Sequence, residues 1–303
     1  MNVVRLHIPN GPAGLVYEQI EIPQPKAGEV LVRVHAAAIT RDELDWPVNR
    51  LPATPSYEVS GVVAALGKNV EGFTLGDEVF ALTAFDRDGA AAEFVIVPQG
   101  LLAHKPKTLD HIQSAAIPMT ALTAWQGLFE HGHLEKGQRV LIHGATGGVG
   151  HVAVQLARWC GAHVIGTVSS ENVEIARNIG VTEIVDTSTT RFESTIHNVD
   201  LVFDTAGGER LEHSPAVIRK GGRLVSVATE PPKEYANSLG VEALYFVVSP
   251  NREQLNEIAH LVDDGCLHPI IAEVFPLSRA REAFEKCQTH RGVGKIVLQV
   301  VEE

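Results

Sequence analysis

The chain has 303 residues, 45% of them hydrophobic, and a formal net charge of −12. The length predicts about two domains, and the composition is that of a globular protein rather than a disordered or collagen-like one. The negative charge argues against nucleic acid as a partner, and no apolar stretch reaches the roughly 18 residues that a membrane span needs.

The first residues and the cysteines bear on the cellular compartment. The opening segment, MNVVRLHIPN, lacks the features of a secretory signal. Cys160, Cys266 and Cys287 form no set at metal-ligand spacing, and they cannot all be paired within a monomer. We therefore expect free thiols in a reducing setting and a cytoplasmic location.

The first third of the chain consists of short predicted strands. Residues 29–35 (EVLVRVH) alternate, with Val30, Val32 and Val34 on one face. Further strands are predicted at 58–66, 77–82 and 92–97, each rich in β-branched residues and bounded by Gly, Pro or Asp. This spacing predicts a β-rich, barrel-like unit. Near Pro106 the pattern changes to helix, with Thr108 as the expected N-cap and a helical pattern over residues 120–131.

From Arg139 onward, strands and helices alternate. We expect strands at 139–143, 163–168, 183–185, 200–204 and 222–227, and helices at 149–160, 172–179 and 208–218. Such alternation implies right-handed βαβ crossovers and a doubly wound parallel sheet. The last part of the chain adds predicted helices at 252–264 and 278–286, and strands at 270–274 and 295–300.

A glycine-rich turn, HGATGGVG at residues 143–150, joins a predicted strand to a predicted helix. Its spacing is that of a dinucleotide-binding fingerprint with Ala at the first glycine position. Gly147 would let the backbone approach a pyrophosphate, and Gly150 would let the helix pack closely against the strand. Free N–H groups at the start of the helix would face the phosphates. The strand–turn–helix context favours this interpretation over a merely tight turn, and the predicted contacts are Ala145, Thr146, Gly147, Gly148 and Val149.

The end of the next strand indicates which dinucleotide binds. NAD-binding units place Asp or Glu there, about 20 residues on, to hold the ribose 2′-hydroxyl. This chain has Ser169 and Ser170, whose hydroxyls could donate to a 2′-phosphate that a carboxylate would repel. The pattern therefore favours NADP, although Glu171 follows directly, and the two serines could instead cap the following helix.

Seven motifs in order along almost the whole chain resemble the zinc-independent, quinone-oxidoreductase-like branch of the medium-chain dehydrogenase/reductases. They are EVSGVV at 58–63, GDEVF at 76–80, TALTAW at 120–125, ATGGVG at 145–150, VFDTAGG at 202–208, GGRLV at 221–225 and GKIVL at 294–298. The resemblance implies an α/β fold in which a GroES-like, β-rich catalytic domain carries an inserted Rossmann domain with a doubly wound parallel sheet. We expect the catalytic domain at 1–117, the NADP-binding Rossmann domain at 118–249 and a C-terminal return to the catalytic domain at 250–303.

The positions that correspond to zinc ligands in the metal-bearing relatives are changed here. Thr40 stands where those relatives have a catalytic Cys, and Tyr57 replaces the His of their Gly-His-Glu motif. Their four-cysteine structural lobe is missing. Because Thr and Tyr are poor zinc ligands, no zinc is expected.

Without a metal, the chemistry favours acceptors that delocalise the charge of an incoming hydride, and the resemblance implies NADPH-dependent reduction of quinones or α,β-unsaturated carbonyl compounds. Tyr57 and Thr40 are the candidate catalytic residues. Tyr57 could donate a hydrogen bond or a proton to the acceptor, or it could simply be an aromatic of the cleft wall. Glu58 could hold this loop through hydrogen bonds.

The resemblance also implies cofactor contacts outside the glycine-rich turn. They are Thr123, Ala206, Val227, Ala228, Phe246, Val248 and Lys295. The alternatives are an apolar edge strand for residues 245–248 and a surface strand lysine for Lys295. Similar reductases place a Lys and a Tyr near the 2′-phosphate, where this chain has Asn172 or Val173 and Thr187.

The apolar residues 241–248, at the expected edge of the sheet, predict a homodimer. We expect a small-molecule quinone or enone as substrate, with no nucleic-acid or membrane partner. The alternatives are an enoyl reductase dedicated to one biosynthetic substrate, and an NADPH-binding sensor or structural protein without turnover. Residues 45–53 and 231–239 are the variable loops expected to shape the acceptor pocket.

Overall fold

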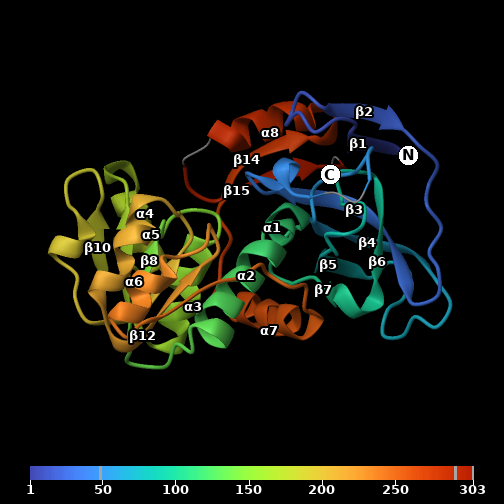
Figure 1. Ribbon diagram of the computed structural model, residues 1–303. Coiled ribbons are helices and arrows are strands. Elements are labelled where there is room, and N and C mark those ends of the chain that lie inside the picture. Colours follow the sequence, from blue (N-terminus) through green and yellow to red (C-terminus); the bar gives the residue numbers. More distant parts are fainter. Residues whose placement is uncertain (48–49, 290–291, 302–303) are drawn as a thin grey trace.

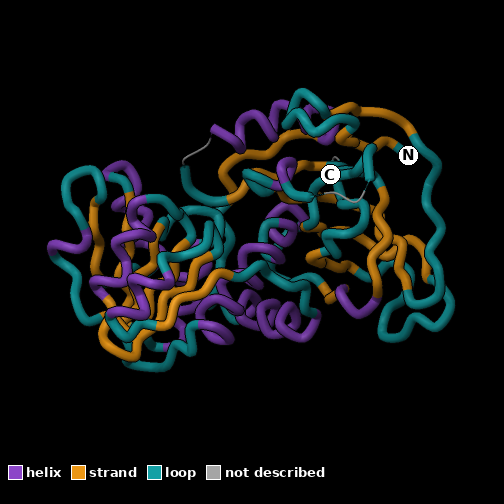
Figure 2. The backbone as a smooth tube through the Cα atoms, viewed as in Figure 1, coloured by secondary structure: helices purple, strands orange, loops and turns teal. Residues whose placement is uncertain are grey.

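The computed structural model describes residues 1–47, 50–289 and 292–301. Each of the two lobes is built around its own sheet, and helices α2 (Pro118–Trp125) and α7 (Arg252–Asp263) lie between the sheets (Figure 1). One lobe is a layer of strands covered by helices, and the other consists mainly of strands and loops (Figure 2).

The six-stranded sheet is parallel throughout. Its strands, in spatial order, are β10 (Glu183–Asp186), β9 (His163–Val168), β8 (Arg139–His143), β11 (Val199–Asp204), β12 (Ile218–Ser226) and β13 (Glu242–Tyr245). The helices of this lobe are α3 (Gly150–Cys160), α4 (Val173–Ile179), α5 (Glu209–His213) and α6 (Lys233–Ser238). The central strands are buried on both faces, which explains their continuous apolar runs. The predicted doubly wound sheet is confirmed, and its order reverses at β8, where such sheets bind ligands.

The second sheet is mostly antiparallel. Its path is β14 (Ile271–Pro276), β15 (Lys295–Gln299), β3 (Glu29–Ile39), β4 (Glu58–Leu66), β5 (Glu78–Leu82) and β7 (Leu102–His104), and β6 (Phe94–Pro98) also pairs with β3. Strands from the end of the chain therefore complete a sheet begun in its first third. Alanines on β3 and on α1 (His111–Ala115) let this helix pack closely against the sheet, beside Val297 of β15, while α8 (Ala280–Thr289) packs on β14 and β15.

Three expected elements differ from the structure. Asp110, not Thr108, caps α1, because its carboxylate accepts from the backbone N–H of Gln113 while the Gln113 side chain accepts from the Asp110 N–H. The hydroxyl of Thr108 instead donates to Asp263 on α7. The helix expected at 120–131 begins at Pro118 and becomes π-helical over Gln126–His131. The helix expected at 208–218 is only α5 and a 3₁₀ turn, since Ile218 already starts β12.

Sequence analysis also missed elements that the structure contains. Strands β1 (Asn2–Leu6) and β2 (Leu15–Gln19) form a separate antiparallel pair, and α6 follows β12. The expected loop 45–53 includes residues 48–49, which lie outside the described residues. Within the described ranges, no helix has both the length and the apolar character needed to cross a bilayer.

Candidate active site

The glycine-rich turn connects β8 to α3, and two of its glycines have different surroundings. A Cβ on Gly150 would lie 2.0 Å from the carbonyl oxygen of Gly144, so the backbone of the turn leaves no room for a side chain there. A Cβ on Gly147 would meet only the Gly144 oxygen, at 3.3 Å. The turn therefore has one glycine required for close packing and another whose outer face is open, as a pyrophosphate cradle needs.

This open face borders a cavity of about 780 Å³ between the two lobes. The turn lines one side, and residues of β15 and of the loop after β3 line the other. Nine of the predicted site residues line it: Thr40, Thr146, Gly147, Gly148, Val149, Ser169, Ala206, Ala228 and Lys295. A cavity of this size, lined by both lobes at the switch point of the parallel sheet, suits a dinucleotide.

The other seven predicted residues are not among the described residues that line this cavity. They are Tyr57, Thr123, Ala145, Ser170, Val227, Phe246 and Val248. Helix α2 contributes Met119 and Thr120 instead of Thr123, whose hydroxyl donates to the Met119 carbonyl one turn earlier. Phe246 is buried against the ring of His131, with 4.4 Å between the ring centroids.

Lys295 is the centre of a buried polar network where the lobes meet. Its side chain is 6% exposed, so the surface-lysine alternative is wrong. The Nζ lies 2.5 Å from Oε2 of Glu58, which is 1% exposed, and donates to Thr40 Oγ1 at 3.2 Å. The other Glu58 oxygen accepts from the backbone N–H of Met119 at 3.0 Å. Strands β4 and β15 and helix α2 thus meet at the ion pair between Glu58 and Lys295.

Burial raises the pKa of two carboxyl groups in this network. The pKa of Glu58 is raised by desolvation, and the charge of Lys295 is the largest opposing influence. Desolvation raises the pKa of Glu43 to about 8, again against the charge of Lys295. The two Glu43 oxygens accept from the backbone N–H groups of Thr40 and Ser56, both at 3.0 Å, and so fix the loop that carries Thr40.

Tyr57 lies in an aromatic cluster beside this network. Its ring is 4% exposed and packs against Trp46 and Phe85, with ring centroids 5.9 and 5.2 Å away. Desolvation raises its pKa to about 12, so the phenol keeps its proton at neutral pH. No hydrogen bond joins this hydroxyl to another described residue. Tyr57 therefore has a spare donor as well as the packing of a cleft-wall aromatic.

The two serines after β9 are used differently. Ser169 lines the cavity, and its hydroxyl donates to Glu171 at 3.3 Å. The Ser170 hydroxyl donates to Asp186 Oδ2 at 2.6 Å, and this bond lowers the pKa of the Asp186 carboxyl. Neither side chain caps the short helices that follow, so the helix-capping alternative is wrong. The hydroxyl pair expected to face a 2′-phosphate is therefore already partnered by carboxylates.

The residues at the former zinc positions do not fit a metal. Thr40 accepts from Lys295, and Tyr57 is a buried phenol whose pKa of about 12 opposes the deprotonation that metal binding needs. Among the described residues, no group of three His, Cys, Asp or Glu side chains is arranged to hold an ion. By contrast, the open face of Gly147 and the cavity beside it fit a nicotinamide dinucleotide.

Two family models match the chain. Residues 26–107 match the alcohol dehydrogenase GroES-like domain, and residues 179–298 match the family described as zinc-binding dehydrogenase. The name of the second family includes zinc, whereas no three described His, Cys, Asp or Glu side chains are arranged to hold an ion.

Individual relatives match over most of the chain. A probable zinc-binding oxidoreductase, mitochondrial, of Arthroderma benhamiae is 33% identical over 92% of this chain and 90% of its own length. The NADPH-dependent alkenal/one oxidoreductase, chloroplastic, of Arabidopsis thaliana is 30% identical over 92% of this chain and 74% of its own. The solved quinone oxidoreductase of Coxiella burnetii superposes with a TM-score of 0.92, at 29% identity, over 99% of both chains.

Proposed function

The chain belongs to the medium-chain dehydrogenase/reductase superfamily, and we propose that it is a metal-free reductase that transfers hydride from NADPH to quinones or α,β-unsaturated carbonyl compounds. The resemblance and the fold class expected from the sequence, a GroES-like domain with a Rossmann domain, are confirmed. Two relatives carry a nicotinamide cofactor in their names, an NAD(P)H oxidoreductase of Mus musculus and the NADPH-dependent alkenal/one oxidoreductase of Arabidopsis thaliana. The NADPH preference, the acceptor class and the absence of zinc are parts of the proposal.

One observation carries the proposal. The resemblance places Thr40 and Tyr57 at the positions of zinc ligands in the metal-bearing relatives, and Thr40 lines the cavity opposite the glycine-rich turn. A simple ketone needs a metal or a well-placed acid to take the charge that develops on its oxygen, whereas a quinone or enone delocalises the incoming charge onto its own oxygen and needs less help. The names of two relatives, an alkenal/one oxidoreductase and a quinone oxidoreductase homolog, agree with such acceptors.

The chain's own residues would hold the cofactor and orient the acceptor. Bound NADPH supplies the hydride. The backbone of Gly147 and Gly148 would cradle the pyrophosphate, and the ammonium of Lys295 would face its negative charge. The hydrogen bond that Lys295 donates to Thr40 Oγ1 fixes this hydroxyl at the edge of the cavity. Tyr57 does not line the dinucleotide cavity, so an acceptor would have to bind against its aromatic cluster with Trp46 and Phe85; there the phenol, protonated at neutral pH, would donate to the acceptor oxygen.

The test is steady-state oxidation of NADPH with a panel of one quinone, one enone and one saturated ketone. We expect turnover with the quinone or the enone and none with the ketone. A Tyr57→Phe variant keeps the ring packing and should lose roughly 100-fold of kcat, the lower range for general-acid catalysis, with little change in the KM for NADPH. Turnover of the ketone alone would contradict the proposal. Tight NADPH binding without any turnover would favour the sensor, and turnover of only one enone would favour the dedicated enoyl reductase.

A homodimer through β13 is proposed as well. This strand is the edge of the six-stranded sheet, and the segment around it exposes apolar side chains, Tyr245 and Val247 among them, with Val247 63% exposed. Light scattering should give twice the chain mass, and a Val247→Lys variant should give the monomer mass. A monomeric wild type would remove this proposal. The cytoplasmic location stays a prediction, and the relatives include proteins named as mitochondrial and chloroplastic.

A further inference from the structure

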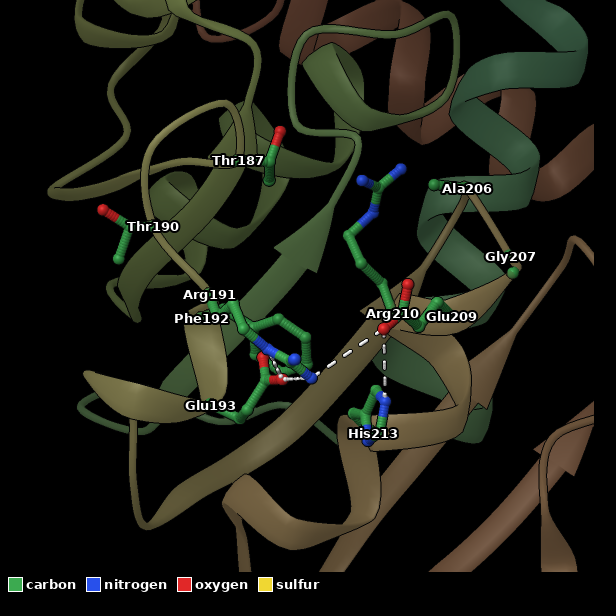
Figure 3. Close-up of a pocket in the computed structure, with 11 residues that line it drawn as sticks. Thr187, Thr190, Arg191, Phe192, Glu193, Ala206, Gly207, Glu209, Arg210 and His213 are labelled. Atoms are coloured by element: carbon green, nitrogen blue, oxygen red, sulfur yellow. Dashed lines mark hydrogen bonds and ion pairs between the residues drawn. The ribbon is translucent and has the colours of Figure 1, made fainter.

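A second cavity adjoins the proposed dinucleotide cavity. Its volume is about 530 Å³, and the two cavities share Thr187, Ala206 and Arg210. Figure 3 shows Arg210 extending from α5 so that its guanidinium ends between Thr187 and Ala206. Arg210 therefore stands at the junction of the two spaces, at the carboxyl ends of the parallel strands.

The guanidinium of Arg210 has no hydrogen-bond or ion-pair partner among the described residues, and its charge acts at longer range on the buried Asp204 carboxyl. Its Nε is buried without a hydrogen bond, and it forms no ion pair within the described ranges. The neighbouring charged groups pair with one another instead: Arg191 lies 2.6 Å from Glu193 and 3.8 Å from Glu209, and His213 lies 3.6 Å from Glu209. Figure 3 shows this network on the opposite side from the Arg210 guanidinium. A buried donor without a partner is costly, which points to an anionic ligand.

The position of Arg210 indicates which anion. Ser169 follows β9, Thr187 follows β10 and Ala206 follows β11, and all three line one cavity with Arg210. In a doubly wound sheet this side of the switch point receives the adenosine half of a dinucleotide. The hydroxyls of Ser169 and Thr187 already donate, to Glu171 and to the Val168 carbonyl. Arg210 is thus the donor that remains available.

We propose that Arg210 binds the 2′-phosphate of NADPH and thereby sets the preference for NADPH over NADH. This inference rests on the proposed function, since it assigns the cofactor form used at that same site. Arg is suited to this task because its planar fork can donate two hydrogen bonds to one phosphate. It would replace the Lys and Tyr that similar reductases place near this phosphate, where this chain has Asn172 or Val173 and Thr187.

The nearby carboxylates make the preference for NADPH over NADH depend on Arg210. Glu171 and Asp186 accept from the hydroxyls of the two serines that follow β9, and Asp186 is half-buried. Both would repel a 2′-phosphate, whereas either could accept from a 2′-hydroxyl. Removal of the Arg210 charge should therefore shift the preference toward NADH rather than weaken both cofactors equally.

The test is a binding titration that needs no turnover. Dissociation constants of NADPH and NADH are measured by nucleotide fluorescence for the wild type and for Arg210→Gln and Arg210→Lys. We expect Arg210→Gln to weaken NADPH about 10- to 100-fold, the range for a lost charge-assisted hydrogen-bond pair, and to change NADH less than about threefold. Arg210→Lys should lose less NADPH affinity than Arg210→Gln, because a lysine retains the charge although it lacks the planar fork. The matched control is Arg191→Gln, whose exposed side chain is paired with Glu193 and should leave both affinities unchanged.

Adenosine 2′,5′-bisphosphate and AMP are fragment probes of the same subsite, and only the bisphosphate should lose affinity in Arg210→Gln. Equal losses for NADPH and NADH, or no loss at all, would overturn the inference, as would a wild type that prefers NADH. Should Arg210→Gln melt far below the wild type, Arg210→Lys and the fragment ratio of the wild type decide the question. A protein that binds NADPH through Arg210 but reduces no acceptor would refute the proposed function and leave this inference standing.

Discussion

The ion pair between Lys295 and Glu58 gives the sharpest stability prediction. Both groups are almost fully buried and lie 2.5 Å apart, so Lys295→Met would leave the Glu58 carboxylate buried without its counter-charge. Removal of one partner of a buried pair costs about 3–5 kcal/mol. At roughly 2–4 °C per kcal/mol, the Tm of the cofactor-free protein should fall by about 6–20 °C near pH 7.

The stability loss of Lys295→Met should depend on pH, and the pKa of Glu58 determines in which direction. Burial already raises the pKa of Glu58, and the charge of Lys295 is the main influence that lowers it. In Lys295→Met the pKa of Glu58 should rise further. The folded variant then keeps Glu58 protonated at pH values where Glu58 in the unfolded chain, with its ordinary pKa of about 4.3, is ionised. Folding that takes up a proton loses stability as pH rises, by up to about 1.4 kcal/mol per unit. The deficit of Lys295→Met relative to wild type should therefore be smaller at pH 5 than at pH 8.

The assay is thermal unfolding of the cofactor-free proteins at pH 5, 6, 7 and 8. The matched control is the double variant Glu58→Gln/Lys295→Met, because a neutral buried pair avoids the unpaired charge and should recover most of the lost stability. A Tm within about 2 °C of wild type for Lys295→Met, or a deficit that does not change with pH, would refute the reasoning. Failure of the double variant to recover would show that packing of the lysine, and not its charge, matters.

Four further outcomes are expected. Gly147→Val should weaken dinucleotide binding at least about tenfold with an unchanged Tm, because its Cβ points into open cavity; unchanged affinity would contradict the cradle. Gly150→Ala should lower stability by about 1–3 kcal/mol, the usual cost of overpacking, since its Cβ would lie 2.0 Å from the Gly144 oxygen; an unaltered Tm would count against this geometry. Chelators such as EDTA should leave turnover unchanged, and inhibition reversed by added zinc would contradict a metal-free mechanism. The Glu43 pKa of about 8 means that stability falls as pH rises from the ordinary pKa of 4.5 toward 8. Glu43→Gln should remove that slope in urea denaturation, although it also loses one acceptor for a backbone N–H, and a slope that persists would exclude Glu43 as its source.

The Rossmann sheet was predictable because its strands carry their signal locally. Strands β8 and β9 were placed at their observed bounds, since each is a short apolar run with a turn on either side. Strands β1 and β2 gave no such signal, because β2 is a half-exposed edge strand that keeps Val16 and Tyr17 in solvent. Helix α6 (KEYANS) follows two prolines and buries only Ala236, which leaves no apolar period to detect.

The candidate site was predictable only where it is one contiguous segment. The glycine-rich turn is such a segment, and its open and closed glycines have the surroundings that the spacing implied. Arg210 was missed because nothing in its own sequence window distinguishes it from a surface arginine. Its position depends on where α5 packs relative to the ends of β9 and β10. A half-buried cation of this kind can be recognised only when the partners of the neighbouring charged residues are known.

The width of the cleft is likewise a property of contacts between distant segments. The ring of His151, in the first turn of α3, donates from Nδ1 to the Gly147 carbonyl at 2.9 Å and accepts from the Ile270 N–H at Nε2 at 3.1 Å. This pairing requires the neutral ring, which agrees with the fall of its pKa to about 4 on burial. His151 thus ties the glycine-rich turn to the segment just before β14, the strand that pairs with the strand of Lys295. The hydrogen bond between His151 and Ile270 therefore helps to fix the separation between the glycine-rich turn and Lys295. The two residues are 119 positions apart in the sequence, so no local sequence pattern could have predicted this contact.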